Sequence, residues 1–239
     1  MLVITNLNKS FGGTKAIVDF CAEVDTKQII GIIGPNGAGK TTILNTISNI
    51  IAPDSGSIEL DGKKIVGKEK HKIAHMGISR TFQNIRLFSN MTVLENILVV
   101  LKERFPKMSN AELRKKAIGV LEEYGWTTDY NMRPDNLPYG VKRKLELIRA
   151  MSTRPCILML DEPAAGMNPT EIKELISYIK HIRETYDIGI VLIEHRMEVV
   201  LELCDRIYVQ NFGETIAVGT PEEITKDERV IEAYIGGVG

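Results

Sequence analysis

The sequence predicts an α/β fold with a mostly parallel central sheet, an antiparallel β layer near the N-terminus, and a helical subdomain inserted into the chain. Two observations concern strands: short stretches in the first sixty residues alternate apolar and polar positions, whereas three other apolar runs are continuous. Alternation is typical of strands with one solvent-facing side, and continuous runs are typical of strands covered on both faces. The third observation is that helical periodicity fills most of the chain between the first two continuous runs.

The antiparallel layer is predicted from segments such as residues 17–24, where apolar and polar side chains alternate, and from the turn signal Asp61-Gly62. The continuous runs are residues 29–33, 156–160 and 189–193. We expect them to be neighbouring strands of the parallel sheet. A last β pattern covers residues 206–218 and is hinged at residues 211–213, so the chain returns to β structure near its C-terminus.

The helical insertion is predicted from three periodic segments. These segments are residues 92–105, 111–124 and about 141–152. Ser109 and Glu112 have the spacing of a capping box in front of the second segment. The third segment is expected to end before Pro155, because the residue ahead of a proline disfavours helical geometry. Residues 84–155 are therefore expected to form the inserted subdomain.

Composition excludes several classes of protein. The 30 lysines and arginines nearly balance the 31 aspartates and glutamates, so a nucleic-acid binder that works through a general basic surface is disfavoured. The longest uninterrupted apolar runs, such as residues 97–101, are far shorter than the roughly 18 residues that span a bilayer. Residues 1–6 carry no basic leader and no sustained apolar stretch, so we expect no secretory signal and a cytoplasmic chain.

Cysteines and histidines give little support for a metal site. Cys21, Cys156 and Cys204 are odd in number, widely spaced and set in apolar stretches, so we expect reduced core residues rather than disulfides or metal ligands. His71 and His75 lie four residues apart on an expected helix, a spacing that suits a metal, but two ligands without a third are insufficient. The interleaved lysines make a solvated basic face the better interpretation.

Residues 34–41 fit the phosphate-binding pattern G-x-x-x-x-G-K-[ST], directly after one buried strand and before a helix. Glycines let successive backbone N–H groups curl around phosphate oxygens, and the helix adds the positive end of its dipole. Lys40 is predicted to contact the β and γ phosphates and Thr41 to ligate Mg²⁺. The fold class is thereby narrowed to a P-loop NTPase core, with a structural glycine-rich turn as the weaker alternative. The residues expected to hold ATP in this loop are Gly34, Pro35, Asn36, Gly37, Ala38, Gly39, Lys40, Thr41 and Thr42.

Polar residues follow the other two buried runs. Asp161-Glu162 comes after the second run and His195 follows the third. If these strands are parallel neighbours, their carboxyl ends share the edge where ligands bind in open α/β sheets. We expect Asp161 to support Mg²⁺, Glu162 to act as general base for an attacking water, and His195 to sense the γ-phosphate. A solvated acidic pair and a structural histidine are the alternatives.

Together with Gln83 in residues 80–84 (Arg-Thr-Phe-Gln-Asn) and with residues 137–141 (Leu-Pro-Tyr-Gly-Val), these motifs resemble the ATP-binding subunits of ABC transporters over nearly the whole chain. The resemblance implies that Gln83 contacts the metal and the water and reports to a membrane subunit. It also implies that adenine stacks on Phe11, for which core packing is the alternative. The chain would be a single ABC ATPase domain, with an ATP-binding core formed by residues 1–83 and 156–239.

In this family the loop at residues 137–141 caps the γ-phosphate bound to the opposite subunit. The resemblance therefore implies a dimer of ATPase subunits, either two copies or this chain with a related ATPase, and makes Tyr139 and Gly140 nucleotide contacts. The loop departs from the family's Leu-Ser-Gly-Gly-Gln pattern, and Pro138 has neither hydroxyl nor N–H. We expect a weakened trans contact that rests on Gly140 and the helix end. The basic residues that follow are expected to form a solvated helix face, with a role toward the partner as the alternative: Lys142, Arg143, Lys144 and Arg149.

A helix is also predicted from Pro169 to about residue 185. Asn168 is a natural N-cap, and the fixed φ of Pro169 suits the first helical position. Asn168 also stands where most ABC ATPases carry an aspartate. A helix cap and an intersubunit contact are therefore equally open roles for this side chain.

Within the family, several segments are similar to the LivG-type ATPases of branched-chain amino acid importers. They are residues 80–84, 91–96, 139–140, 164–169, 194–197 and 230–236. The similarity implies an importer ATPase that is peripheral to the cytoplasmic side of the membrane, binds transmembrane permease subunits through residues 84–88, and is served indirectly by a solute-binding protein. An importer for another small solute, such as urea or an amide, is one alternative. The others are a soluble ABC ATPase acting on nucleic acid and a nucleotide-binding regulator that has lost catalysis.

Overall fold

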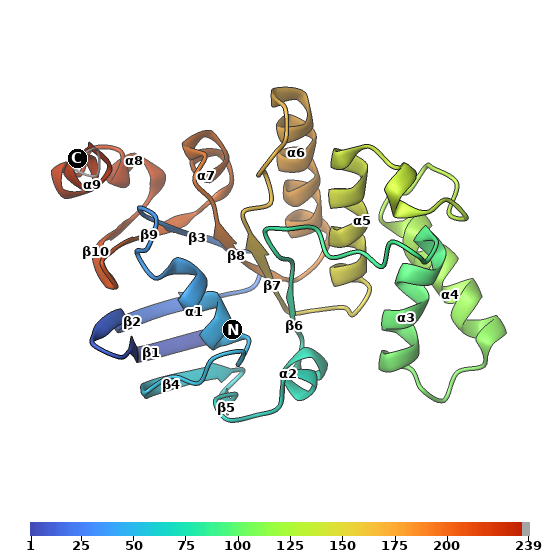
Figure 1. The fold of residues 1–239 in the computed structure, drawn as a ribbon, viewed down its shortest axis with the longest axis horizontal. Coiled ribbons are helices and arrows are strands. Elements are labelled where there is room, and N and C mark those ends of the chain that lie inside the picture. The colour runs from blue at the N-terminus through green and yellow to red at the C-terminus, as the bar shows by residue number, and fades with distance from the viewer. Residues whose placement is uncertain (236–239) are drawn as a thin grey trace.

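The computed structural model describes residues 1–235 and contains two sheets (Figure 1). The smaller sheet is antiparallel and has the strand order β2-β1-β4-β5. Its strands are β1 (Leu2–Phe11), β2 (Thr14–Val24), β4 (Ser55–Leu60) and β5 (Lys63–Lys64). Phe20, Ala22 and Val24 of β2 are buried, while the residues between them are exposed. The alternation in the sequence therefore corresponds to strands with one covered face.

The larger sheet has the strand order β10-β9-β3-β8-β7-β6, and its strands all run parallel except β10, which is antiparallel to β9. Its strands are β3 (Ile29–Ile33), β6 (Ile78–Arg80), β7 (Ile157–Asp161), β8 (Gly189–Ile193), β9 (Arg206–Asn211) and β10 (Glu214–Gly219). The continuous apolar runs form β3, β7 and β8, in which every residue is buried. β7 begins one residue later than its predicted run, and β6 is too short to give a period in the sequence.

The parallel strands face two separate apolar cores. On one side Ile30 and Ile32 of β3 pack with the antiparallel sheet, α1 (Lys40–Ile47) and α2 (Lys70–Met76). On the other side Ile29 and Ile33 pack with the remaining helices. Those helices are α3 (Val93–Arg104), α4 (Asn110–Glu123), α5 (Tyr139–Met151), α6 (Pro169–Thr185), α7 (Met197–Leu203), α8 (Pro221–Ile224) and α9 (Glu228–Ile235). Because both faces are covered, β3 and β8 carry no polar side chain, and β7 carries one only at its last position, Asp161.

After β6, the chain places α3, α4 and α5 side by side at one end of the molecule (Figure 1). The expected capping box begins α4: the Glu112 N–H donates to Ser109 Oγ, and the Ser109 N–H donates to the Glu112 carboxylate. A short 3₁₀ turn (Pro134–Asn136) leads to α5. α5 begins at Tyr139, two residues before the predicted start, because Pro138 has the extended backbone (ψ 155°) of a residue that precedes a helix.

The cysteine prediction is wrong for Cys21. Cys204 is buried and Cys156 is half-buried, but Cys21 is exposed. Cys21 lies between the buried residues Phe20 and Ala22, and successive side chains of a strand point to opposite faces. The apolar character of its neighbours therefore belongs to the other face of β2. All three sulfurs are free.

Membrane-spanning helices and metal-binding clusters of side chains are both absent from residues 1–235. No helix there is both long enough and apolar enough to cross a bilayer. No group of three or more histidine, cysteine, aspartate or glutamate side chains there is arranged to hold a metal ion. His71 and His75 lie on exposed positions of α2, with their ring centroids 6.5 Å apart.

Asn168 caps α6 within its own chain. Its Oδ1 accepts hydrogen bonds from the N–H groups of Thr170 at 2.9 Å and Glu171 at 3.0 Å. In return the Asn168 N–H donates to Glu171 Oε2 at 3.0 Å, which completes a capping box. Asn168 therefore has a role in the fold of one subunit that needs no partner.

Replacing Asn168 by alanine is expected to lower the free energy of unfolding by about 1 kcal/mol, because two N–H groups of α6 lose their acceptor. For a chain of this length, such a loss corresponds to a fall in Tm of about 2–4 °C. Thermal unfolding followed by circular dichroism measures it. The control variant Asn168→Asp keeps the acceptor and should melt no lower than the unsubstituted chain. Equal Tm values for all three chains would contradict a stabilising cap.

Candidate functional site

The phosphate-binding loop joins β3 to α1 at the carboxyl ends of the parallel strands. Main-chain atoms of both sheets approach it closely. A Cβ at Gly39 (φ +96°) would lie 2.0 Å from the carbonyl oxygen of Ala16, and one at Gly34 would lie 2.0 Å from that of Gln210. Only glycine fits such approaches. The loop is therefore clamped between β2 and β9, in front of the positive end of the α1 dipole.

Lys40, the first residue of α1, folds back over this loop. Its Nζ donates to the carbonyl oxygens of Gly34 and Pro35, at 2.8 Å each. Burial lowers the pKa of Lys40, and the acidic pair at the end of β7 opposes that shift. The ammonium group therefore lies near both carboxylates of the predicted site. Thr41, which follows it, is exposed at the start of α1.

Asp161 is the last residue of β7 and is paired with Arg80 of β6, at 2.6 Å between Oδ2 and Nη2. Both side chains are buried. Arg80 also donates to Asn45 Oδ1 at 2.8 Å and to Ser48 Oγ at 3.1 Å, so its guanidinium bridges β7 and α1. Sequence reasoning missed Arg80, since its position beside Asp161 depends on the pairing of the short strand β6.

Glu162 is contacted by two other predicted site residues. Gln83 Nε2 donates to its Oε2 at 2.7 Å, and His195 Nε2 lies 2.9 Å from its Oε1. The main chain of Glu162 is left-handed, with φ +47°, and its N–H donates to the carbonyl oxygen of Ile193 at 2.9 Å. Such a conformation costs a non-glycine residue about 1–3 kcal/mol. The structure thus brings together side chains from three separate loops around one carboxylate.

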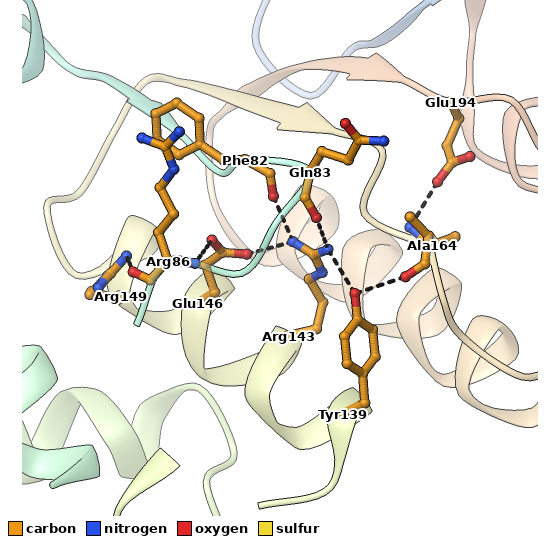
Figure 2. A network of polar contacts seen from close by, with 10 residues as sticks. Phe82, Gln83, Arg86, Tyr139, Arg143, Glu146, Arg149, Ala164 and Glu194 are labelled. Carbon is orange, nitrogen blue, oxygen red and sulfur yellow. Dashed lines mark hydrogen bonds and ion pairs between the residues drawn. The ribbon is translucent and has the colours of Figure 1, made fainter. Parts of the chain in front are cut away.

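Glu194 is a buried carboxylate that sequence reasoning treated only as the neighbour of His195. Its Oε1 accepts the N–H of Ala164 at 2.7 Å, a contact drawn in Figure 2. Its Oε2 accepts the N–H groups of His195 at 2.8 Å and Arg196 at 3.2 Å. Glu194 therefore ties the loop after β7 to the loop after β8. In the sequence, its position directly after a continuous apolar run was the signal that could have identified Glu194 as a site residue.

Phe11 ends β1 and is 49% exposed, so core packing, the alternative to adenine stacking, is excluded for it. Lys9 Nζ lies 5.4 Å from the centroid of its ring. The hairpin of β1 and β2 also supplies Ala16, whose carbonyl group packs against Gly39. The hairpin therefore lies beside the phosphate-binding loop, and adenine stacking on Phe11 stays a prediction.

Tyr139 and Gly140 contact the loop after β7 and α6, not the phosphate-binding loop of their own chain. Tyr139 Oη donates to the carbonyl oxygen of Ala165 at 2.9 Å, and the Gly140 N–H donates to Glu171 Oε1 at 3.3 Å. α5 and α1 pack on opposite faces of the parallel sheet, and Figure 1 shows them on either side of β7. The structure therefore separates these two residues from the other predicted nucleotide contacts.

The expectation of a solvated basic face along α5 is wrong for Arg143, whose side chain is 0% exposed. Its guanidinium donates to main-chain carbonyl groups of the loop after β6 and to Glu146. The signal in the sequence was its spacing, four residues before the buried Leu147. Residues four apart lie on the same face of a helix. Arg143 therefore belongs to the buried face of α5.

Residues 84–88, predicted to meet a membrane subunit, border an apolar groove of about 840 Å³ between α2, α3 and α5. Phe88 is 47% exposed at this groove, and Val99 of α3 is 38% exposed. The buried amide of Asn96 holds the segment, because it accepts the Phe88 N–H at 2.9 Å and donates to the Phe88 carbonyl oxygen at 3.1 Å. The exposed ring of Phe88 is thus carried by a fixed main chain.

Comparison with known proteins agrees with this geometry. A family model described as "ABC transporter" matches residues 18–165, and one described as "Branched-chain amino acid ATP-binding cassette transporter" matches residues 214–239. The chain is 42% identical to BraF of Pseudomonas aeruginosa, a high-affinity branched-chain amino acid transport ATP-binding protein, over 99% of this chain and 98% of that protein. It is also 42% identical, with the same coverage, to LivG of Escherichia coli, which carries the same description.

Among solved structures, the chain is similar to the crystal structure of a nucleotide-free ATP-binding cassette from an ABC transporter. The identity is 32%, the TM-score is 0.89, and the match covers 99% of each chain. The predicted fold class is therefore confirmed. Full-length relatives and a family model that spans more than half of the sequence agree with the loop, strands and helices described above. The chain therefore belongs to the ABC transporter family, within the group of ATP-binding proteins that includes LivG and BraF.

Proposed function

We propose that this chain is the ATP-binding and ATP-hydrolysing subunit of an importer for branched-chain amino acids. The observation that carries hydrolysis is the Glu162 carboxylate, which Gln83 and His195 contact at the edge of the sheet that also bears the phosphate-binding loop. The solute class rests on the relatives, whose names specify branched-chain amino acid transport, and on the family model that matches residues 214–239.

Mg²⁺ is the cofactor that suits the chemistry of the available donors. Asp161 offers a carboxylate, Thr41 a hydroxyl and Gln83 an amide oxygen, and Mg²⁺ at nucleotide sites takes a few protein oxygens together with phosphates and waters. Arg80 pairs with only one of the two Asp161 oxygens, Oδ2. The metal, when bound, would neutralise charge on the phosphates while the γ-phosphoryl group is transferred to water and ADP leaves.

Different residues of this chain have different roles in ATP hydrolysis. The N–H groups of the loop and Lys40 bind the β and γ phosphates, for which Lys40 gives up its present carbonyl acceptors. Glu162 takes the proton of the attacking water. Gln83 and His195 orient that carboxylate and contact the γ-phosphate, so both the water and its target are placed by one cluster.

We assign closure of the site to a second ATPase subunit, either another copy or a related chain. Gly140 lies away from the phosphate-binding loop of its own chain, in the first turn of α5, where N–H groups and the helix dipole favour phosphate once the Gly140 N–H leaves the Glu171 carboxylate. Pro138 contributes neither hydroxyl nor N–H to that contact. A missing hydrogen bond to a charged group costs about 1.5–3 kcal/mol, so the trans contact is weakened rather than abolished.

The groove beside residues 84–88 is assigned to a cytoplasmic loop of the permease subunits. Exposed apolar side chains at a preformed groove are typical of a protein-binding surface, and Phe88 and Val99 supply them here. The chain would then be peripheral on the cytoplasmic side of the membrane and respond only indirectly to a solute-binding protein. Residues 84–155 would act as the unit that connects this groove to the loop at Tyr139.

Replacing Glu162 by glutamine is expected to lower kcat for ATP hydrolysis by at least about 100-fold, because an amide does not take the proton of the water. Binding of Mg-ATP, measured by calorimetry, should remain. Glu202→Gln changes an exposed carboxylate on α7 and is the control, for which kcat should equal that of the unsubstituted chain. An unaltered rate of phosphate release from Glu162→Gln would remove the assignment of the base.

Replacing Phe11 by alanine is expected to raise KM for ATP by about 10-fold, since stacking of a base on an aromatic ring contributes about 1–3 kcal/mol. Tm should change little, because about half of the side chain is exposed. Steady-state kinetics and thermal unfolding of the same preparations measure both quantities. Phe11→Tyr retains a stacking surface and should keep the original KM. The stacking role fails if alanine leaves KM unchanged.

A further inference from the structure

Arg143 joins α5 to the loop that carries Gln83. Its Nη1 donates to the carbonyl oxygen of Phe82 at 2.9 Å, and its Nη2 donates to the carbonyl oxygen of Gln83 at 2.8 Å (Figure 2). One planar guanidinium therefore holds two successive peptide groups. The contact acts on the main chain of the loop and leaves the side chain of Gln83 for Glu162.

Glu146, one turn further along α5, bonds both to Arg143 and to the same loop. Its Oε2 accepts from Arg143 Nη1 at 2.5 Å, and its Oε1 accepts the N–H of Arg86 at 3.1 Å. Arg149, again on α5, donates to the carbonyl oxygen of Arg86. Figure 2 shows these side chains reaching from one helix to the same loop. The main chain on either side of Gln83 is thereby fixed to α5.

The Arg143–Glu146 pair is poorly suited to a purely stabilising role. The two side chains are 0% and 2% exposed, and within residues 1–235 the Nε of Arg143 has no hydrogen-bond partner. Taking two charges out of water is costly, and apolar side chains of similar volume often serve stability equally well. This charged pair supplies directed hydrogen bonds to the loop, and an apolar pair would supply none.

The other end of the connection is the proposed base. Gln83 Nε2 donates to Glu162 Oε2 at 2.7 Å, so a single residue lies between Arg143 and Glu162. On the α5 side, Arg143 Nη2 lies 3.5 Å from Tyr139 Oη, which in turn donates to the carbonyl oxygen of Ala165 at 2.9 Å. Tyr139 belongs to the loop assigned to the nucleotide of a neighbouring subunit. The guanidinium therefore lies between residues of two different nucleotide sites.

We propose that Arg143, supported by Glu146, is a positioning residue that couples the start of α5 to the contact between Gln83 and Glu162 within one subunit. When the loop at Tyr139 engages a neighbouring nucleotide, α5 shifts, and the guanidinium carries that shift to the main chain of Gln83. The inference rests on the proposed ATPase function. It adds a route by which the loop that covers one ATP sets the geometry for hydrolysis of the other.

The variant Arg143→Lys tests the role of the planar group. Lysine keeps the charge but is a point donor, so it does not hold two carbonyl groups as a guanidinium does. In the full chain at saturating Mg-ATP, we expect kcat to fall by about 10-fold or more, because small displacements of a catalytic group have effects of that size. KM for ATP should be unchanged, since the phosphate-binding loop is untouched.

Lys144→Met is the matched control. Lys144 is the next residue of α5, and its Nζ also donates to a main-chain carbonyl group, that of Gly125 at 2.6 Å. The control therefore removes a comparable bond between the same helix and a different loop. We expect kcat to equal that of the unsubstituted chain, whatever the change in Tm.

A double-mutant cycle with Gln83→Ala separates positioning from a general loss of structure. If Arg143 acts through Gln83, Arg143→Lys lowers kcat in the original background but not in the Gln83→Ala background. A merely structural effect lowers kcat by the same factor in both backgrounds. Equal factors would therefore overturn the inference.

If the Arg143→Lys chain does not fold, Glu146→Gln takes its place in the same cycle. It keeps the shape of the side chain and removes the charge that orients Arg143, so we expect a smaller fall in kcat and faster hydrogen exchange at the Arg86 amide. A kcat equal to that of Lys144→Met would overturn the inference here too. An unsubstituted chain that hydrolyses no ATP with magnesium would instead overturn the proposed function.

Discussion

The parallel pairing of β3, β8 and β7 is the constraint on which the site depends. In this register Asp161 lies opposite Ile193, so the loops that follow β7 and β8 leave the sheet together. The N–H of Glu162 then bonds to the carbonyl oxygen of Ile193, which fixes the acidic residue to the strand that leads to His195. A phosphate-binding loop, a carboxylate and an imidazole from distant parts of the sequence meet because three strands end at one edge.

The two faces of that sheet hold the site in different ways. On the face of α1 the phosphate-binding loop is fixed by close main-chain contacts at Gly34 and Gly39, and those contacts leave no room for another arrangement. On the other face, the residues that act on Glu162 come from loops held by polar bonds, Gln83 by Arg143 and His195 by Glu194. Hydrogen bonds can be exchanged for others while the apolar core stays closed. The proposed nucleotide contacts thus lie on the rigid face, and the proposed response to a neighbouring subunit depends on the adjustable one.

Much of the fold was predictable because its signals are local. The continuous apolar runs indicate strands covered on both faces, and the spacing of Ser109 and Glu112 indicates the start of α4. Arg143 was misplaced because a charged residue on a helix has the same local pattern whether its partner is water or a carbonyl group 61 residues away. Cys21 was misplaced because the apolar side chains beside it, Phe20 and Ala22, lie on the opposite face of β2 and say nothing about the face of Cys21. The roles of Gln83, Glu162 and His195 could be proposed from strand ends and family resemblance, but their mutual distances required the fold.

Glu171 serves the starts of two helices at once. Its Oε2 accepts the N–H of Asn168 at the beginning of α6, and its Oε1 accepts the N–H of Gly140 at the beginning of α5. The N-terminal end of a helix favours a nearby negative charge, and at both of these helix starts Glu171 of the same chain already supplies it. In a subunit without a partner, Glu171 therefore neutralises the N-terminal end of α5. An anion such as inorganic phosphate would meet this carboxylate there instead of a free Gly140 N–H group.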